Sequence, residues 1–248
     1  SKAFRRGAYD VAQSDPWLSG APVDPETVLS HEIGLKSRLF GDRVQLNLAA
    51  FDVTYKDLQF FVNVGGSASV TTNAGEASVG GVEANLIANL ARGLTAHLQY
   101  SHQDGESSGI PAEAGITEGV APQGTVPNTY IAALEYASRV GGGELTMRVD
   151  YTHKDRYNLE FNDTPQFFSE VEGLVNARIA WRFPNERLEL ALWGKNLTDE
   201  NIVIYGQDFW FAYYDTASFL TDPAIAELTA QPRYADPRTW GVSFLYRH

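Results

Sequence analysis

A serine nucleophile is the first chemistry that the sequence suggests. Residues 105–109 read GESSG and match the G-x-S-x-G pattern of a nucleophile elbow. That elbow requires a strand before the serine and a helix after it, but Ile110 and Pro111 follow here, in a segment of small and acidic residues. We therefore interpret the match as chance. No zincin motif, P-loop or dinucleotide fingerprint occurs either, so the sequence predicts no catalytic residue, no cofactor and no enzyme.

The histidines and acids do not define a metal site. Of the five histidines, only His97 and His102 are close, and a spacing of five places them on neither one helix face nor one strand face. The absence of cysteine excludes a thiolate site and a disulfide scaffold. The acidic segments 104–126 and 199–236 could offer carboxylate oxygens to calcium, but a solvated acidic surface is the simpler interpretation. No metal site is predicted.

A dense aromatic group is the better candidate for a binding site. Six aromatic residues lie within an 11-residue segment: Phe209, Trp210, Phe211, Tyr213, Tyr214 and Phe219. Exposed rings in a loop are unfavourable, so they must pack against the protein or against a ligand, and both alternatives stay open. If they bind a ligand, Trp210, Tyr213 and Tyr214 would stack on a flat or sugar-like molecule, and the flanking Asp208 and Asp215 would hydrogen-bond its polar edges.

The elements that position these residues are β-strands. Apolar and polar residues alternate strictly over 94–101, 145–152, 175–183 and 239–247, and less regularly over 29–39, 43–60, 78–90, 128–140 and 187–204. A period of two predicts a strand with one apolar and one polar face, which gives about nine strands. The pattern over 43–60 changes phase, and we interpret the change as a bulge near Ala49 and Ala50.

Connections between the expected strands alternate in length. Short ones lie at 41–42, 91–93, 141–143 and 184–186, and long ones at 65–76, 104–127, 158–170 and 205–236. Short turns at one end and long loops at the other are typical of outer-membrane barrels. Strands of about 10–14 residues also exceed the usual soluble length of about 5–6. The fold expected is therefore an all-β, antiparallel up-and-down transmembrane barrel, here a partial barrel of about nine to ten strands.

Aromatic residues are expected at both ends of these strands. Trp181, Phe183 and Tyr246 lie near the short turns, whereas Tyr100, Tyr130 and Tyr151 lie near the long loops. Two such girdles are characteristic of the two membrane interfaces. Ordinary cross-strand aromatic packing is the alternative.

Charge separates the two faces of the expected sheet. The net charge of −12 argues against a nucleic acid partner. The sequence has no run of 18 apolar residues, so it predicts no transmembrane helix. In a barrel, the charged residues of the polar faces would line a wet lumen and pair across strands. They are Glu32, Lys36, Arg38, Glu83, Glu135, Arg148, Asp150, Arg178, Arg182, Glu189 and Lys195.

Six segments, in the same order along the chain, resemble motifs of TonB-dependent receptors. They are 1–7 (SKAFRRG), 25–37 (PETVLSHEIGLKS), 50–59 (AFDVTYKDLQ), 73–83 (NAGEASVGGVE), 192–200 (LWGKNLTDE) and 237–241 (PRTWG). The resemblance implies a barrel of about 22 strands plugged by an N-terminal domain. Residues 1–248 would form its C-terminal part, with the plug and the first half of the barrel lying upstream. His248 departs from the family, whose members usually end in an aromatic residue.

The resemblance implies an outer-membrane receptor that takes up a scarce ligand, such as a ferric siderophore, with energy supplied through TonB. Its expected partners are outer-membrane lipid, the TonB complex and a small-molecule ligand. A passive porin or an adhesin would share the barrel pattern and lack the six segments. A soluble all-β binding protein is the third alternative.

Overall fold

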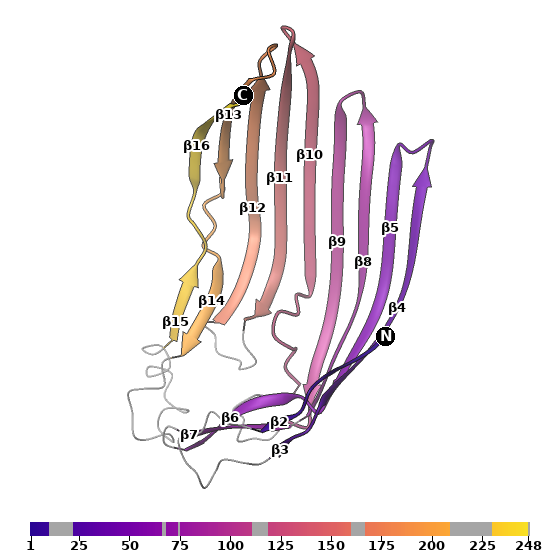
Figure 1. Ribbon diagram of the computed structural model, residues 1–248, viewed down its shortest axis with the longest axis vertical. Helices are drawn as coiled ribbons and strands as arrows, with labels where there is room; N and C mark the ends of the chain where they lie inside the picture. Colours follow the sequence, from indigo (N-terminus) through magenta and orange to yellow (C-terminus); the bar gives the residue numbers. More distant parts are fainter. Residues whose placement is uncertain are drawn as a thin grey trace.

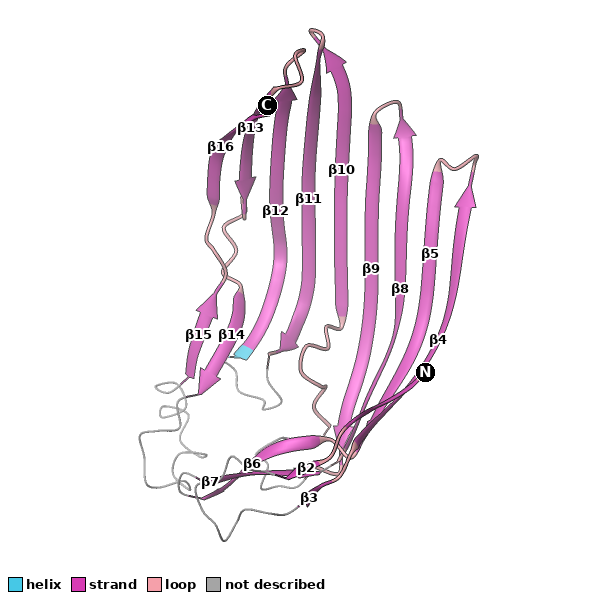
Figure 2. Ribbon diagram, in the orientation of Figure 1, coloured by secondary structure: helices cyan, strands magenta, loops and turns pink. Residues whose placement is uncertain are grey.

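The computed structural model describes residues 1–9, 22–65, 68–73, 75–110, 119–159, 167–208 and 230–247. These residues are nearly all in antiparallel strands, with one short helical turn at Phe167 (Figure 2). Across the ranges just given, no helix is long and apolar enough to cross a membrane.

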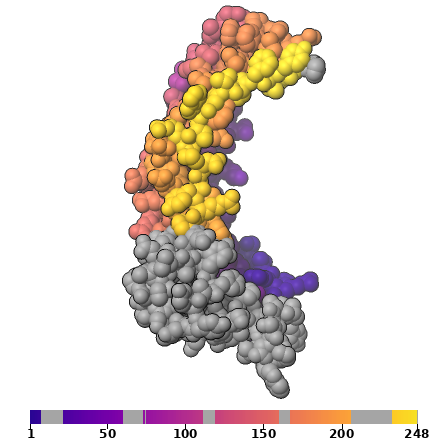
Figure 3. Space-filling model, turned by 90° about the vertical axis from the view of Figure 1, so that its left-hand side faces the viewer, coloured from indigo at the N-terminus to yellow at the C-terminus, as the bar shows by residue number. Residues whose placement is uncertain are grey.

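Ten strands form one curved antiparallel sheet in which neighbours follow the chain order (Figure 1). They are β1 (Lys2–Arg5), β4 (Glu26–Leu39), β5 (Val44–Lys56), β8 (Glu76–Ala91), β9 (Leu94–Ser108), β10 (Asn128–Val140), β11 (Gly143–Asn158), β12 (Phe168–Arg182), β13 (Leu188–Lys195) and β16 (Thr239–Tyr246). The side view shows the curvature of this sheet (Figure 3). An up-and-down partial barrel is confirmed, with β1 and β16 as its two edges.

Short turns join the strands at one end of the sheet only (Figure 1). They contain left-handed residues, among them Asp42 (φ 64°), Gly93 (φ 76°) and Glu186 (φ 57°). At Gly93 a side chain would also collide with the backbone, since a Cβ would lie 2.0 Å from the carbonyl oxygen of Ala137. The predicted asymmetry of the connections is therefore confirmed.

Three small hairpins lie at the opposite end, where loops were expected (Figure 1). They pair β2 (Ala8–Tyr9) with β3 (Pro22–Val23), β6 (Gln59–Gly65) with β7 (Ala68–Asn73), and β14 (Val203–Asp208) with β15 (Ala230–Tyr234). The strand expected over 43–60 therefore ends at Lys56, and the one expected over 187–204 ends at Lys195. Left-handed residues stop both, namely Asp57 (φ 57°) and Asn196 (φ 50°).

The pairing register separates an apolar face from a polar one, because residues that stand directly opposite each other share a face. One continuous row on the apolar face runs Leu134, Val149, Ala177, Gly194 and Trp240 across five strands. Large apolar side chains remain exposed on it, including Ile33 at 76% and Phe244 at 68%. The charged residues lie on the opposite face, which would line the lumen of a closed barrel. We call the apolar face outward.

The expected bulge near Ala49 and Ala50 is wrong. Strand β5 pairs without a register shift from Val44 to Lys56 with both β4 and β8. The phase changes because the outward face itself turns polar: Ala50 is followed on that face by Asp52, Thr54 and Lys56. The strand thus continues beyond the apolar band.

The outer boundary of the apolar band shifts from strand to strand. The first polar outward residue is Asp52 on β5, His102 on β9 and His153 on β11. In the pairing register, His102 lies two residues nearer the short turns than the row of Asp52. The row of His153 lies two residues nearer the short turns again. A level boundary crosses the register in this way when strands are tilted, as they are in membrane barrels.

Candidate ligand-binding mouth and lumen face

Two ion-pair networks lie on the lumen face. In the first, Arg148 stands opposite Glu135 and binds it at 3.2 Å, while the same guanidinium binds Asp150 at 2.6 Å. All three side chains are part-exposed, which is consistent with a wet surface. Such pairs each stabilise the fold by about 0–1 kcal/mol, so their main effect is to hold the side chains in place.

The second network crosses β11, β12 and β13. Arg182 binds Glu144 at 2.9 Å and Glu189 at 3.2 Å, and Glu189 also accepts a 2.7 Å bond from Arg178. Glu189 is the least exposed of these side chains, at 15%. The expected cross-strand pairing is confirmed for these residues. No ion pair within the described ranges involves Glu32, Lys36, Arg38, Glu83 or Lys195, although they share the lumen face.

A polar depression of about 430 Å³ lies on the lumen side of β4, β5, β8, β9 and β10. Its polar lining comprises Glu32, Lys36, Asn47, Glu83, Asn85, Gln99, Ser101 and Thr129. These groups offer both donors and acceptors. The surface therefore suits a polar, hydrogen-bonding occupant rather than an apolar one.

The corner between the sheet and the β6–β7 hairpin is tied by Asn73. Its Nδ2 donates to the carbonyl oxygens of Asp24 and Asp57, both at 2.8 Å, and its Oδ1 accepts from the backbone N–H of Asp24 at 2.5 Å. Nearby, Gln59 Nε2 donates to the carbonyl oxygens of Asp24 at 3.0 Å and Arg6 at 3.2 Å. We call Asn73, Gln59 and the groups they bind the mouth clasp. It fixes where the hairpin leaves the sheet.

A second corner, 196–199, joins β13 to β14. The buried Asn196 donates from Nδ2 to the carbonyl oxygens of Glu200 at 2.9 Å and Asp236 at 3.3 Å. Asp199 accepts from the backbone N–H of Arg238 at 3.1 Å. These bonds hold the base of the β14–β15 hairpin against the start of β16. Asn196 is thus a turn residue, although it falls within the strand expected over 187–204.

An outer polar belt of His102, Asn128, Asp155 and His153 lies just beyond the apolar band. Asn128 accepts from Tyr100 Oη at 3.0 Å and lies 3.2 Å from His102 Nδ1, and its amide donates to Asp155 at 2.6 Å. Both ring nitrogens of His153 face acceptors, the carboxylate of Asp155 at 3.1 Å and a backbone carbonyl at 2.9 Å. Only the protonated imidazole can donate to both.

Aromatic residues lie near both ends of the strands, and their role as girdles at two membrane interfaces stays a prediction. Tyr100 and Tyr130 lie opposite each other beneath the outer polar belt, with ring centroids 5.0 Å apart. Near the short turns, Trp181 stacks on Phe183 at 4.8 Å.

The predicted ligand residues are not brought together by the described part of the chain. Trp210, Tyr213, Tyr214 and Asp215 lie outside the described residues, and Asp208 ends β14 with its side chain also outside them. Their role stays a prediction.

Other sequence candidates have structural roles or lie apart. His97 and His102 lie on opposite faces of β9, as their odd spacing requires. The Ser107 hydroxyl donates to the carbonyl oxygen of Val120 at 2.7 Å and is buried. In the ranges that the structure covers, no group of three or more His, Asp or Glu side chains is placed to hold a metal ion.

The mouth clasp is a structural feature that the sequence reasoning missed. Its signal was present, since Asn and Asp tolerate left-handed turns and bond to nearby backbone. Asn73 and Asp57 both lie at strand ends.

The fold is that of known iron-uptake receptors. The chain superposes on the ferric yersiniabactin uptake receptor FyuA of Yersinia pestis with a TM-score of 0.75 and 16% identity, covering 99% of this chain and 34% of that one. For BauA, the ferric preacinetobactin receptor of Acinetobacter baumannii, the TM-score is 0.67 at 16% identity, covering 99% and 33%. This chain therefore spans about a third of the length of these receptors. No curated protein sequence matches it.

The family model described as TonB dependent receptor-like, beta-barrel matches residues 1–197. That match covers most of the chain, and the superpositions extend the same fold over the remainder. The chain belongs to the TonB-dependent receptor β-barrel family.

Proposed function

We propose that residues 1–248 form the C-terminal part of the barrel of an outer-membrane receptor that imports a ferric siderophore. The observation that carries this proposal is the two-sided sheet: an outward apolar band backs a charged, ion-paired lumen face. The charges of the lumen face require water or a polar occupant, because an unpaired charge in lipid is costly. The outward band requires lipid. Such a wall suits a pathway for a polar ligand through the outer membrane.

Ligand capture is assigned to the end that carries the hairpins. The β6–β7 and β14–β15 hairpins lie at this end, and the chain between β14 and β15 carries the aromatic group. Trp210, Tyr213 and Tyr214 would stack on the ligand, with Asp208 and Asp215 bonding its polar edges. Aromatic contacts contribute about 0.5–1.5 kcal/mol each beyond area burial, so a few would matter for capture at low concentration.

Energised import requires parts of the receptor outside this chain. A plug domain and the first half of the barrel would complete the lumen, and the TonB complex would act on the N-terminal region. The paired carboxylates and guanidiniums of the lumen face, together with the depression around Lys36 and Glu83, offer polar groups against which such a plug could pack.

A passive porin with the same wall is the second candidate function, since a charged lumen also suits water-filled channels. Uptake of radiolabelled iron separates the two. The full-length receptor is expressed in a Gram-negative strain lacking its own siderophore receptors, with and without TonB, and a panel of ferric siderophores is supplied. Uptake of one siderophore that stops when TonB is removed is expected. Uptake unaffected by TonB, or entry of many small solutes, would favour the porin.

A further inference from the structure

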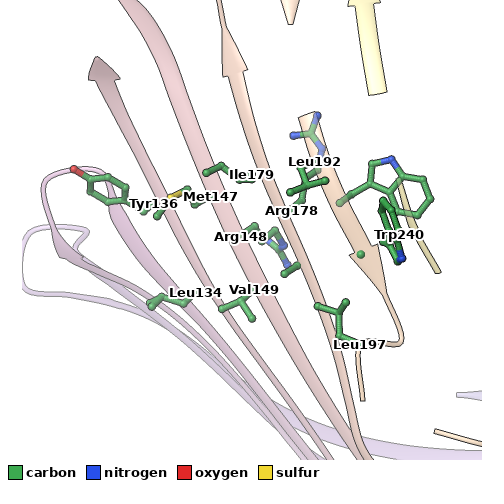
Figure 4. Close-up of a pocket in the computed structure, with 13 residues that line it drawn as sticks. Leu134, Tyr136, Met147, Arg148, Val149, Arg178, Ile179, Leu192, Leu197 and Trp240 are labelled. Atoms are coloured by element: carbon green, nitrogen blue, oxygen red, sulfur yellow. The ribbon is translucent and has the colours of Figure 1, made fainter. Parts of the chain in front are cut away.

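An apolar groove of about 520 Å³ crosses the outward face between β10 and β16 (Figure 4). Its side walls come from large apolar residues on five strands, and Figure 4 shows them around the hollow. Those of the outward face are Leu134, Tyr136, Met147, Val149, Ile179, Leu192 and Trp240. These outward residues belong to the apolar band, and Arg148 and Arg178, whose positions face the lumen, also line the groove.

The groove exists because two adjacent positions in one row lack bulk. Ala177 and Gly194 stand opposite each other on β12 and β13, between Val149 and Trp240. Leu197 forms the outer wall by folding back over Gly194, where a Cβ would lie 2.5 Å from Leu197 Cδ2. A hollow of this kind leaves its lining without packing partners unless something fills it.

A cation lies close in the chain to two lining residues: Arg238 comes two residues before Trp240, and it bonds Asp199, two residues after Leu197. Arg238 is held by the turn that supplies Leu197, because its guanidinium binds Asp199 at 3.3 Å and its backbone N–H binds the same carboxylate. The Arg238 side chain is 52% exposed. One guanidinium nitrogen of Arg238 makes this bond. Among the described residues, no other ion pair or hydrogen bond involves its remaining guanidinium nitrogens. A guanidinium presents five donors, so several remain for an anion.

We propose that this groove binds one phosphate-bearing lipid of the outer leaflet. An acyl chain lies over Ala177 and Gly194, and the lipid phosphate accepts hydrogen bonds from Arg238. The argument rests on charge complementarity at the rim and on depth, since Arg238 lies at the long-loop end, where the apolar band stops. A flexible acyl chain fits a narrow hollow, whereas a stable protein partner needs about 800 Å² on each side. Arginine is also well suited to phosphate because it donates two parallel bonds.

The test uses the full-length receptor, delipidated in mild detergent and titrated with phosphatidylglycerol or with diacylglycerol of the same chains. Native mass spectrometry counts the bound molecules. One tightly bound phosphatidylglycerol is expected. Ala177→Leu fills the groove and should abolish this binding. Arg238→Gln should weaken phosphatidylglycerol binding at least tenfold, as expected for the loss of charge-assisted bonds, and leave diacylglycerol binding unchanged.

The matched control is Ala50→Leu, which adds the same bulk to the outward face of β5, between Ile33 and Val82 and away from the groove. It should bind lipid as the unchanged protein does. Retention of the tight lipid in Ala177→Leu, or equal loss in Ala50→Leu, would overturn the proposal. So would a dimer of the receptor that Ala177→Leu dissociates, since a second copy would then occupy the groove. If Ala177→Leu folds poorly, Arg238→Gln still tests the proposal, because it changes an exposed side chain.

Discussion

The side chain of Asn73 binds both backbone groups of Asp24, 49 residues earlier in the chain. It accepts from the N–H at 2.5 Å and donates to the C=O at 2.8 Å, as a neighbouring strand would. A third bond, to the carbonyl oxygen of Asp57, ties in the end of β5. One amide thus joins three segments at the point where the β6–β7 hairpin leaves the sheet, and so determines the orientation of the hairpin at the mouth.

Replacing Asn73 by Ala should free the β6–β7 hairpin without opening the barrel. Three hydrogen bonds are lost, and each is worth about 0.5–1.5 kcal/mol net. Limited proteolysis of the full-length receptor should therefore cut within 59–73 faster, while the heat-modifiable migration of the barrel stays unchanged. Asn89→Ala is the control, because it removes a bond from Thr95 at the short-turn end. Equal protease resistance in Asn73→Ala and Asn89→Ala would show that the mouth clasp does not hold the hairpin.

Arginine should be tolerated on one face of β11 and not on the other. Val149 faces outward in the apolar band, whereas Thr146 faces the lumen. Val149→Arg should lower the free energy of unfolding by about 2–4 kcal/mol near the membrane midplane, and Thr146→Arg should change it little. Guanidinium unfolding of the receptor in lipid vesicles measures both. Equal costs at the two positions would contradict a lipid-facing band.

The faces and order of the strands were readable from the sequence because both signals are local. Alternation in 145–152 requires no knowledge of any other strand, and short turns pair each strand with the next. The phase change over 43–60 was misread because two causes produce the same pattern. A bulge reverses the faces of a strand. A straight strand keeps its faces, but it gives the same sequence pattern when its outward residues change from apolar to polar between Ala50 and Asp52.

The mouth was not readable, because its contacts are distant in the sequence. The β14–β15 hairpin pairs Val203 with Tyr234 across a long insertion, and no periodic pattern marks so short a strand. The clasp of Asn73 on Asp24 likewise depends on a fold already formed. The groove around Ala177 and Gly194 was hidden for a related reason. Each residue is unremarkable in its own strand, and only the register places them opposite each other.

Alanine at Gly93 should disrupt the β8–β9 turn. Gly93 has φ 76°, and a Cβ there would meet the carbonyl oxygen of Ala137 at 2.0 Å. Left-handed strain and the backbone collision together should cost about 3 kcal/mol or more. Gly41→Ala is the control, since Gly41 has φ 64° but nothing within 4 Å of its Cβ position, so only about 1–2 kcal/mol is expected. The guanidinium concentrations at the midpoint of unfolding are compared for the two variants. A similar loss of stability in both would mean that the backbone at Gly93 shifts and relieves the collision.

Residues 1–248 alone should not form a closed barrel. Among the described strands, β1 pairs only with β4 and β16 only with β13, so both edges expose unpaired backbone groups. Such groups cost several kcal/mol each in hydrocarbon. The isolated chain should therefore aggregate, or stay an open sheet in detergent, when its mass is measured by light scattering. A monodisperse, heat-modifiable species of this chain alone would contradict the expectation.

The aromatic group after β14 should contribute to ligand capture rather than to the barrel. Changing Trp210, Tyr213 and Tyr214 together to Ala removes three stacking partners, and at about 0.5–1.5 kcal/mol each beyond area burial the affinity should fall at least tenfold. Binding of the ferric siderophore identified by the uptake assay is measured by intrinsic fluorescence quenching, with heat-modifiability recorded for every sample. The control is the double change of Tyr205 and Tyr234 to Ala, which removes exposed rings from the β14–β15 hairpin itself and should leave affinity nearly unchanged. If affinity survives the triple change in an intact barrel, the rings do not bind the ligand; if the barrel loses stability and affinity falls only with it, they pack against the protein.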